Sequence, residues 1–486
     1  MSSEPLLKRD QRSPLQWSNV FGVALFAIVC ALAVYATYSS KNVPGSNEPL
    51  SKTGQTGLKA FHNQVYFPVR ALVTGENPYS PAYIQFHPDS KLGKQIAMDP
   101  VPPSTLLILS PLAFLQLHAA EIVYILICVL LSIFCANLLL RSAIDRPPSI
   151  GGIMLTAALM IACLPGVESF VAYPTIMLTL FGVLLAIEHS GKQDLLSGIG
   201  ILLAFCQPVI GVAILILIVF RRHFGAIAFG ILLLLILNVV AVAWIGNNTE
   251  GGVSQAIDDA QGLYSSLYKP VVAENLQASS DRVDAHSVVA RLFSSNPQIA
   301  RQTNLHCYIA TGLLIIAVIA LLAERDHTQM QGLISRSGML IATVTILFFY
   351  QTTGALYLLW IPVIGLLLDG GRAERAFSLP MRFILGLLVV LPLFNYFVTP
   401  YAMDRLGISA GGISAGGVAT EATAPFSLRS LFESWQFPNP DLAQWQTVVT
   451  VNSILIAAAV LMIATRMIFS ICLDQEIMEA QEANAA

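Results

Sequence analysis

Charged residues are scarce in this sequence. Only 11% of its 486 residues are Asp, Glu, Lys or Arg, whereas 55% are hydrophobic. A typical soluble protein has about 25% charged residues, so these few charges cannot cover two or three water-exposed domains. Inside a bilayer the backbone amides need partners within their own segment, which in long apolar runs means helices. The composition therefore predicts an all-α polytopic membrane protein.

Clusters that indicate several other functions are absent from the sequence. With a net charge of −3 and no basic cluster, nucleic acid is not an expected partner. The eight His residues are scattered, no pair lies four apart on an apolar helix, and no Asp-x-Asp run occurs, so we expect no metal and no cofactor. The seven Cys residues lie almost entirely inside apolar runs, which is typical of small core side chains rather than disulfides.

The first long apolar run covers residues 20–38 and follows Lys8, Arg9 and Arg12. No small-residue cleavage site follows it, so we expect a signal anchor in the plasma (inner) membrane, with the N-terminus in the cytoplasm. Later runs bring the expected bundle to about 10–13 transmembrane helices. These runs cover residues 120–140, 150–165, 171–187, 195–220, 225–245, 305–323, 338–350, 355–368, 383–398 and 448–469.

Two apolar segments do not fit a simple spanning helix. Residues 102–117 are short and proline-rich, which predicts a re-entrant or interfacial helix on the outer side. Residues 195–220 are interrupted at Gln207-Pro208, which predicts two half-helices that meet within the membrane. With both segments treated in this way, the basic residues of the short turns fall on the cytoplasmic side. They are Arg141, Arg146, Lys192, Arg221, Arg222, Arg325, Arg336, Arg372 and Arg375.

The same topology divides the chain into parts. We expect a cytoplasmic tail at 1–18, a transmembrane domain at 19–399 with outer loops 41–101 and 246–303, a further outer loop at 400–446, a final transmembrane helix at 447–471 and a cytoplasmic tail at 472–486. Long outer loops beside short inner turns favour chemistry or binding at the outer face. This interpretation requires the two longest loops to converge over a common crevice on that side.

The first outer loop interleaves aromatic, amide and charged residues along an expected helix at 57–73. Tyr66 and Arg70 are four residues apart and therefore share one face of that helix. Arginine pairs with phosphate in a forked geometry, and aromatic rings stack on sugars or lie at headgroup depth. This face suits a polar ligand at the bilayer surface. The alternative is an amphipathic interfacial helix without a ligand.

Several short motifs in and after this loop form a recognisable series. They are Phe61-His62-x-x-Val65-Tyr66, Gly75-x-Asn77-Pro78-Tyr79, Pro102-Pro103 with Leu106-Leu107 and Pro111-Leu112, the segment 198–208 that ends in Gln207-Pro208, and Asn275-Leu276-Gln277-Ala278-Ser279 followed by Arg291. The series resembles glycosyltransferase family 87, whose members are mannosyltransferases of the GT-C fold that use polyprenyl-phosphate mannose. The resemblance implies metal-independent transfer of a hexose, with mannose as the family's sugar, from a polyprenyl-phosphate donor to an acceptor hydroxyl at the outer face.

The sequence departs from the family pattern at three polar positions. The family usually has Asp where this chain has His62, a Gly-Gln-x-Asn pattern at residues 172–175, and Lys-Pro at Gln207-Pro208. Two of these changes remove a charge. A non-catalytic relative that binds or translocates lipid-linked sugar is therefore the alternative function. A general transporter ranks third, because it would be expected to carry charged residues in mid-span.

The implied transfer must deprotonate the acceptor and neutralise the leaving phosphate. His62 is the first candidate base, because histidine side chains ordinarily titrate near pH 6.5, although a structural role fits equally. Asp99 is the second candidate base, or else a cap for the following helix.

Further candidates bind the expected partners, which are the polyprenyl-phosphate-linked sugar, a lipid or glycan acceptor, and membrane lipids. The donor phosphate or lipid candidates are Arg70, Arg291, His286 and Gln207. The sugar or acceptor pocket candidates are Asn63, Tyr66, Tyr79, Tyr173, Asn275, Ser279, Tyr350 and Tyr357. An interfacial arginine can instead bind ordinary headgroups, and Tyr350 and Tyr357 can instead belong to an aromatic belt.

Overall fold

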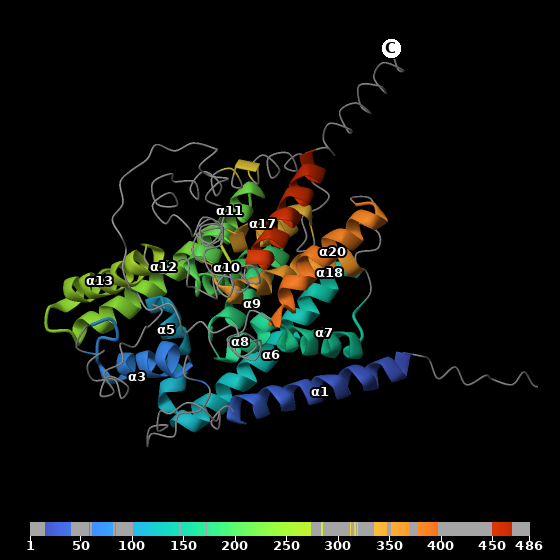
Figure 1. The fold of residues 1–486 in the computed structure, drawn as a ribbon. Coiled ribbons are helices and arrows are strands. Elements are labelled where there is room, and N and C mark those ends of the chain that lie inside the picture. The colour runs from blue at the N-terminus through green and yellow to red at the C-terminus, as the bar shows by residue number, and fades with distance from the viewer. Residues whose placement is uncertain are drawn as a thin grey trace, which may run out of the picture.

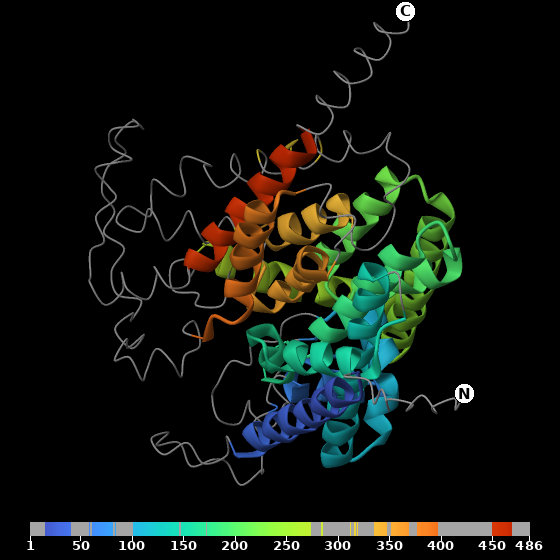
Figure 2. The ribbon, with the colours of Figure 1, turned by 90° about the vertical axis from the view of Figure 1, so that its right-hand side faces the viewer.

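The chain folds as a bundle of helices (Figures 1 and 2). The computed structural model describes residues 15–39, 58, 61–80, 83, 101–144, 147–171, 173–273, 283–284, 312, 315–316, 318, 335–347, 351–368, 377–396 and 450–468. Within these residues α1 (Leu15–Ser39) and the C-terminal helix Thr450–Ile468 lie on opposite sides of the bundle (Figures 1 and 2). The expected all-α polytopic membrane architecture is confirmed.

Three described helices are long and apolar enough to cross a membrane: α6 (Leu117–Ala143), α12 (Phe224–Asn247) and the C-terminal helix. A fourth span results if α7 (Ile150–Ala162) and α8 (Leu164–Val171), which are bent by 73° at their junction, are counted together. The other apolar helices are shorter by this measure, for which α1 counts only over Asn19–Ala33. The count of 10–13 spans and the division into parts therefore stay predictions.

One end of the bundle, which we call the loop face, carries residues 61–80 of the first long loop. Here lie the π-helix η2 (His62–Tyr66), α3 (Phe67–Thr74), the 3₁₀-helix η4 (Ser110–Phe114) and α13 (Gly252–Ala273). Trp244 near the end of α12 donates to the Leu72 carbonyl of α3 at 2.8 Å, which joins this end of α12 to the first loop. The helix expected at 57–73 thus begins with a π-helical turn and ends at Thr74.

The short helix α5 (Pro103–Leu109) lies below the loop face. Its Ser104 amide donates to Asn238 Oδ1 at 3.2 Å, and Asn238 lies nine residues before the end of α12. Nine helical residues span about 14 Å, so α5 begins well below the end of α12 and leads back through η4 into α6. This course agrees with the expected re-entrant segment.

The opposite end of the bundle, the turn face, holds a helical hairpin. After α9 (Ile176–His189), helices α10 (Asp194–Ala204) and α11 (Pro208–Phe220) are separated by a turn at Phe205–Gln207. Both ends of the hairpin return to the same face, because the ring of His223 lies against Gly191 and the carboxylate of Asp194 lies against Gly225. The predicted break at Gln207-Pro208 is present, whereas its position within the membrane stays a prediction. Lys192 lies on the same face as Arg221.

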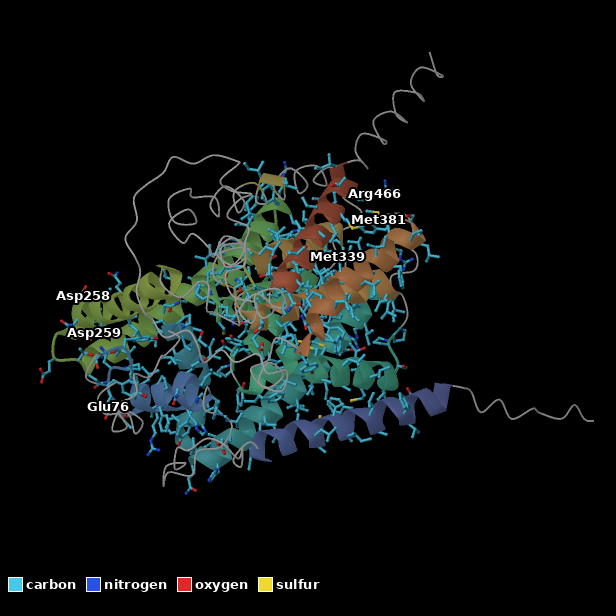
Figure 3. All side chains as sticks on the ribbon, in the orientation of Figure 1. Glu76, Asp258, Asp259, Met339, Met381 and Arg466 are labelled. Atoms are coloured by element: carbon cyan, nitrogen blue, oxygen red, sulfur yellow. The ribbon has the colours of Figure 1, made fainter. Side chains whose placement is uncertain are left out.

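The remaining helices pack behind this hairpin. Arg221 at the end of α11 donates to Ser335 and Ser337 at 2.8 and 3.2 Å, which fixes α17 (Arg336–Leu347) beside it. The chain continues through η5 (Thr353–Leu359), α18 (Trp360–Leu368) and α20 (Leu379–Leu393). Figure 3 shows the two ends of the molecule: Glu76, Asp258 and Asp259 lie at the loop face, whereas Met339, Met381 and Arg466 lie at the other end.

Glycine allows the central helices to approach closely. A methyl group on Gly182 of α9 would lie 2.5 Å from the Ala204 nitrogen of α10, and one on Gly200 would overlap the backbone of Ala186. Methyl groups on Gly198 of α10 and Gly230 of α12 would each lie 2.8 Å from the nearest atom of the facing helix. Small residues let membrane helices gain contact without an aqueous driving force. We call these four glycines, Gly182, Gly198, Gly200 and Gly230, the glycine seam.

Candidate functional site

Two histidines and a glutamate meet at the loop face, and we call His62, His118 and Glu121 the histidine cluster. His62 Nε2 lies 2.7 Å from Glu121 Oε1, and His118 Nδ1 lies 3.0 Å from Glu121 Oε2. His62 is 1% exposed and Glu121 is fully buried, whereas His118 is 70% exposed. Each oxygen of one buried carboxylate therefore has its own histidine, one inside the protein and one at the surface.

The start of α6 places the carboxylate. Helix α6 begins at Leu117, so His118 and Glu121 are three residues apart and share one face. A negative charge near a helix N-terminus is favoured by the helix dipole. Burying a carboxylate costs free energy unless it is paired, and two histidines supply the pairing here.

The π-helix η2 presents His62 to that carboxylate. Its five residues, His62–Tyr66, have the wider turn that is rare in proteins and is often found at functional sites. The neighbouring Phe61 ring stacks on Tyr124 of α6, with ring centroids 4.4 Å apart. This stacking fixes η2 against α6.

Two polar atoms beside this contact have no hydrogen-bond partner. They are His62 Nδ1 and Asn63 Oδ1, and both are buried. An unsatisfied buried polar atom costs about 1–3 kcal/mol, so a bound group that donates hydrogen bonds would be stabilised here. A histidine held against a carboxylate, with its second nitrogen available, has the arrangement of a general base.

Tyr66 and Arg70 extend the site along the same helical stretch. The Tyr66 hydroxyl donates to the Leu115 carbonyl at 2.9 Å, and Arg70 donates to the Tyr66 hydroxyl at 3.3 Å. The contact agrees with the expected pairing of residues four apart. Arg70 itself is exposed, so its guanidinium remains accessible to an anionic group at the loop face.

The segment 75–79 joins the first long loop to the second. Gly75 ends α3 with φ of +84°, a conformation that glycine adopts without strain. The Asn77 side chain accepts a hydrogen bond from the Tyr79 amide and donates one to Asp259 of α13 at 2.7 Å. The Tyr79 hydroxyl donates to the Val101 carbonyl at 2.7 Å. The two long loops are therefore in direct contact at Asn77 and Asp259, whereas their convergence over a common crevice stays a prediction.

Near these loops, Tyr83 is also buried. Its burial, and secondly the charge of Glu76, raise the pKa of the Tyr83 hydroxyl, so the group stays neutral.

Two further candidates are Tyr173, which lies between α8 and α9, and Tyr357, which lies in η5. The Tyr357 hydroxyl donates to the Met160 carbonyl at 2.6 Å, and the Tyr173 ring lies against Gly354 of η5. Tyr124 links this region to Phe61, because its hydroxyl donates to the carbonyls of Ser169 and Pro174. Both tyrosines therefore belong to the same packed region as His62 without contacting the histidine cluster through any hydrogen bond described above.

Gln207 lies at the tip of the α10–α11 hairpin. It precedes Pro208, the first residue of α11, and is partly buried. The adjacent Cys206 forms a side-chain hydrogen bond with Thr105 of α5. The tip of the hairpin thus meets α5, and Gln207 stands at that junction.

A second polar cluster fixes residues 283–284 of the second long loop. The Val283 amide donates to the Gln351 carbonyl at 2.9 Å, and the Gln351 amide donates to Asp284 at 3.3 Å. Ser453 of the C-terminal helix donates to the Val283 carbonyl at 2.8 Å. Asp284 and Gln351 are both buried, so this cluster attaches the loop to the bundle.

Several sequence candidates lie outside the described residues. They are Asp99, Asn275, Ser279, His286, Arg291 and Tyr350. Sequence reasoning missed Glu121, although a signal was present: it is the only acidic residue in the 27 residues of α6. A charged residue within an expected span is itself an indication of function. Among the described residues, no group of three or more His, Cys, Asp or Glu is arranged to hold a metal ion.

Comparison with known proteins identifies the family. The family model described as glycosyltransferase family 87 matches residues 102–349, which is just over half of the chain. The matched segment runs from α5 to α17 and includes Glu121 and Gln207. It begins after His62, so the first-loop motifs lie outside it. No curated protein and no solved structure matches the chain. On the family match, the chain belongs to glycosyltransferase family 87.

Proposed function

We propose that this membrane glycosyltransferase moves a hexose from a polyprenyl-phosphate donor to an acceptor hydroxyl at the extracytoplasmic face of the plasma (inner) membrane. Mannose is the sugar that the family resemblance implies. The observation that carries the proposal is the contact of buried His62 with buried Glu121, which leaves Nδ1 of His62 without a partner. A lipid or glycan hydroxyl is the acceptor class that such a base would activate.

In this mechanism His62 takes the proton of the acceptor hydroxyl as its oxygen attacks the anomeric carbon. The bond between that carbon and the phosphate oxygen breaks, and its electron pair stays with the polyprenyl phosphate. Arg70 is placed to neutralise the phosphate, because its guanidinium is exposed at the loop face and oriented by Tyr66. We assign the same role to Arg291 and His286 of the second loop and a sugar-binding role to Asn63 and Tyr66.

The charge distribution supports an extracytoplasmic loop face. Lys192, Arg221 and Arg222 lie at the turn face, whereas Glu76, Asp258 and Asp259 lie at the loop face (Figure 3). Basic residues are retained in cytoplasmic turns, so the turn face is assigned to the cytoplasm. The N-terminus of α1 is assigned to the same side.

Transfer of radiolabelled mannose from polyprenyl phosphate by membranes that contain the protein tests the proposal. Label should enter the lipid, polymer or protein fraction, and His62→Ala should reduce the rate by at least about 100-fold, since a general base contributes roughly 10²–10⁴. His189→Ala at the turn face is the matched control and should retain the wild-type rate. Retained transfer by His62→Ala, or its loss in Asp99→Ala alone, would show that His62 is not the base.

A non-catalytic relative that binds or translocates lipid-linked sugar is the second candidate. The replacement of the family's usual aspartate by His62 favours it. In that case the purified protein would bind the donor lipid, and no donor would give turnover with any membrane fraction.

A further inference from the structure

We infer that Glu121 is a positioning residue that fixes the tautomer of His62, so that Nδ1 is the nitrogen that receives the acceptor's proton, and that His118 controls the strength of this base from the protein surface. The inference rests on the proposed function. It assigns roles to two residues that lie far from His62 in the sequence, at positions 118 and 121.

The tautomer follows from the contact with the carboxylate. An ionised carboxylate only accepts hydrogen bonds, so His62 Nε2, at 2.7 Å from Glu121 Oε1, must carry the hydrogen. A neutral imidazole has one protonated nitrogen, and Nδ1 therefore holds a lone pair. This nitrogen is the buried atom of His62 that has no partner. The acceptor hydroxyl would donate to it.

The charges balance in each step. When Nδ1 takes the proton, His62 becomes an imidazolium, and the Glu121 carboxylate beside Nε2 stabilises the new positive charge. Nδ1 returns the proton to the released phosphate or to water after the product leaves. Glu121 stays ionised throughout and touches neither sugar nor phosphate, so it acts through His62.

His118 shares this carboxylate. Its Nδ1 lies 3.0 Å from Glu121 Oε2, and its ring is 70% exposed and therefore exchanges protons with solvent. When His118 is protonated, part of the negative charge of Glu121 is offset, and the imidazolium of His62 is stabilised less. Protonation at the surface thus reduces the capacity of the buried base to accept a proton.

The other titratable or charged groups around His62 are few. On its own helical stretch they are Tyr66, whose hydroxyl donates to Leu115, and Arg70, which donates to Tyr66. On α6, Tyr124 stacks on Phe61, and Cys128 lies one turn farther along the helix. The residues of α5 and η4 include no titratable side chain. Among the described residues, Glu121 contacts His62 directly and His118 contacts Glu121.

The position of Glu121 also accounts for a departure from the family pattern. The family usually carries an aspartate at the position of His62. In this chain the carboxylate comes from α6 and contacts the imidazole that occupies the aspartate's place. Compared with the family pattern, the negative charge therefore lies on α6 instead of at position 62, and it contacts a histidine.

The test compares pH–rate profiles of kcat and KM for the full-length protein in proteoliposomes, with polyprenyl-phosphate mannose as donor. Glu121→Gln should lower kcat about 100-fold with KM changed less than about threefold, and should move the midpoint of the rising limb to lower pH. Glu121→Asp should recover at least about tenfold of the lost rate. His118→Asn should move the midpoint to higher pH, because no positive charge at position 118 then offsets Glu121.

A second readout separates this inference from the proposed function. Nitrogen chemical shifts of His62, identified by difference from His62→Ala, should show Nε2 protonated in the wild type and a mixture of tautomers in Glu121→Gln. If the wild type gives no turnover but the shifts behave as expected, the proposed function fails and the positioning by Glu121 stands. If kcat falls without a change in the pH midpoint or in the tautomer, Glu121 has a purely structural role and the inference is overturned.

Discussion

The glycine seam between α9, α10 and α12 and the His62–Glu121 pair of the histidine cluster are both buried, yet they are built from opposite kinds of residue. In the seam, a methyl group at Gly182 or Gly200 would meet the backbone of the facing helix. In the cluster, an ionisable pair is enclosed and His62 Nδ1 has no partner. The seam is therefore sensitive to added volume, whereas the cluster is sensitive to removed charge.

Within one membrane domain, the glycine seam holds helices together, whereas the histidine cluster has the groups that chemistry needs. Backbone amides in the seam are satisfied within their own helices, so close packing leaves no polar atom exposed to a ligand. The histidine cluster keeps costly buried polar groups, which a purely structural core would replace with apolar side chains.

The largest expected loss of stability comes from a larger side chain in the glycine seam. Gly200→Leu should destabilise the protein by at least about 3 kcal/mol, because α9 and α10 must separate to admit the side chain. Thermal unfolding in detergent measures this effect. Gly386→Leu in α20 is the matched control, since a methyl group there meets nothing within 4 Å. Equal destabilisation of the two variants would remove the distinction between seam and surface.

Removal of one partner from the histidine cluster should have a somewhat smaller effect on stability. His62→Leu leaves the buried Glu121 with His118 as its remaining histidine partner, which should cost about 2 kcal/mol. The double variant His62→Leu/Glu121→Leu should regain at least about 1 kcal/mol, because no buried charge remains. Both variants should be inactive. A double variant less stable than His62→Leu would show that the cluster serves stability rather than chemistry.

The contact between the two long loops should contribute about 1 kcal/mol to the free energy of unfolding. A double-mutant cycle of Asn77→Ala and Asp259→Ala should give a coupling free energy of this size, because the hydrogen bond of 2.7 Å joins an amide to a carboxylate. Asp258→Ala, at an exposed neighbouring position, is the control and should show no coupling with Asn77→Ala. Absence of coupling in the first pair would mean that the loops are held together by other contacts.

The smallest expected effect concerns the histidine of the turn face. Burial, and secondly Arg221, lower the pKa of His223, while Asp194 opposes them. Below about pH 6.5 the unfolded chain binds a proton at this position before the folded chain does, so stability falls with pH in that window. His223→Asn should slightly reduce the loss of Tm between about pH 7.5 and 5.5. The control His189→Asn should leave the loss unchanged, and an enlarged loss in His223→Asn would reverse the assigned sign.

Some features of the candidate site were predictable because they depend on local chemistry. The spacing of Tyr66 and Arg70 predicted their contact, and Gln207-Pro208 predicted the break between α10 and α11. The π-helical turn at His62–Tyr66 was not predicted. Helical periodicity in a short polar segment does not distinguish an α-helix from a π-helix, and the choice depends on what η2 packs against.

The sequence alone determined the membrane class, the helix break at Gln207-Pro208 and the family resemblance, because hydropathy, proline geometry and short motifs act over neighbouring residues. Only the tertiary structure decided that Glu121 meets His62 across 59 positions and that Asn77 meets Asp259 across 182. Local patterns limit backbone conformation and burial, but they do not specify which distant side chains come together. That choice follows from how the helices pack, and here it converts an isolated histidine into half of a buried carboxylate–imidazole pair.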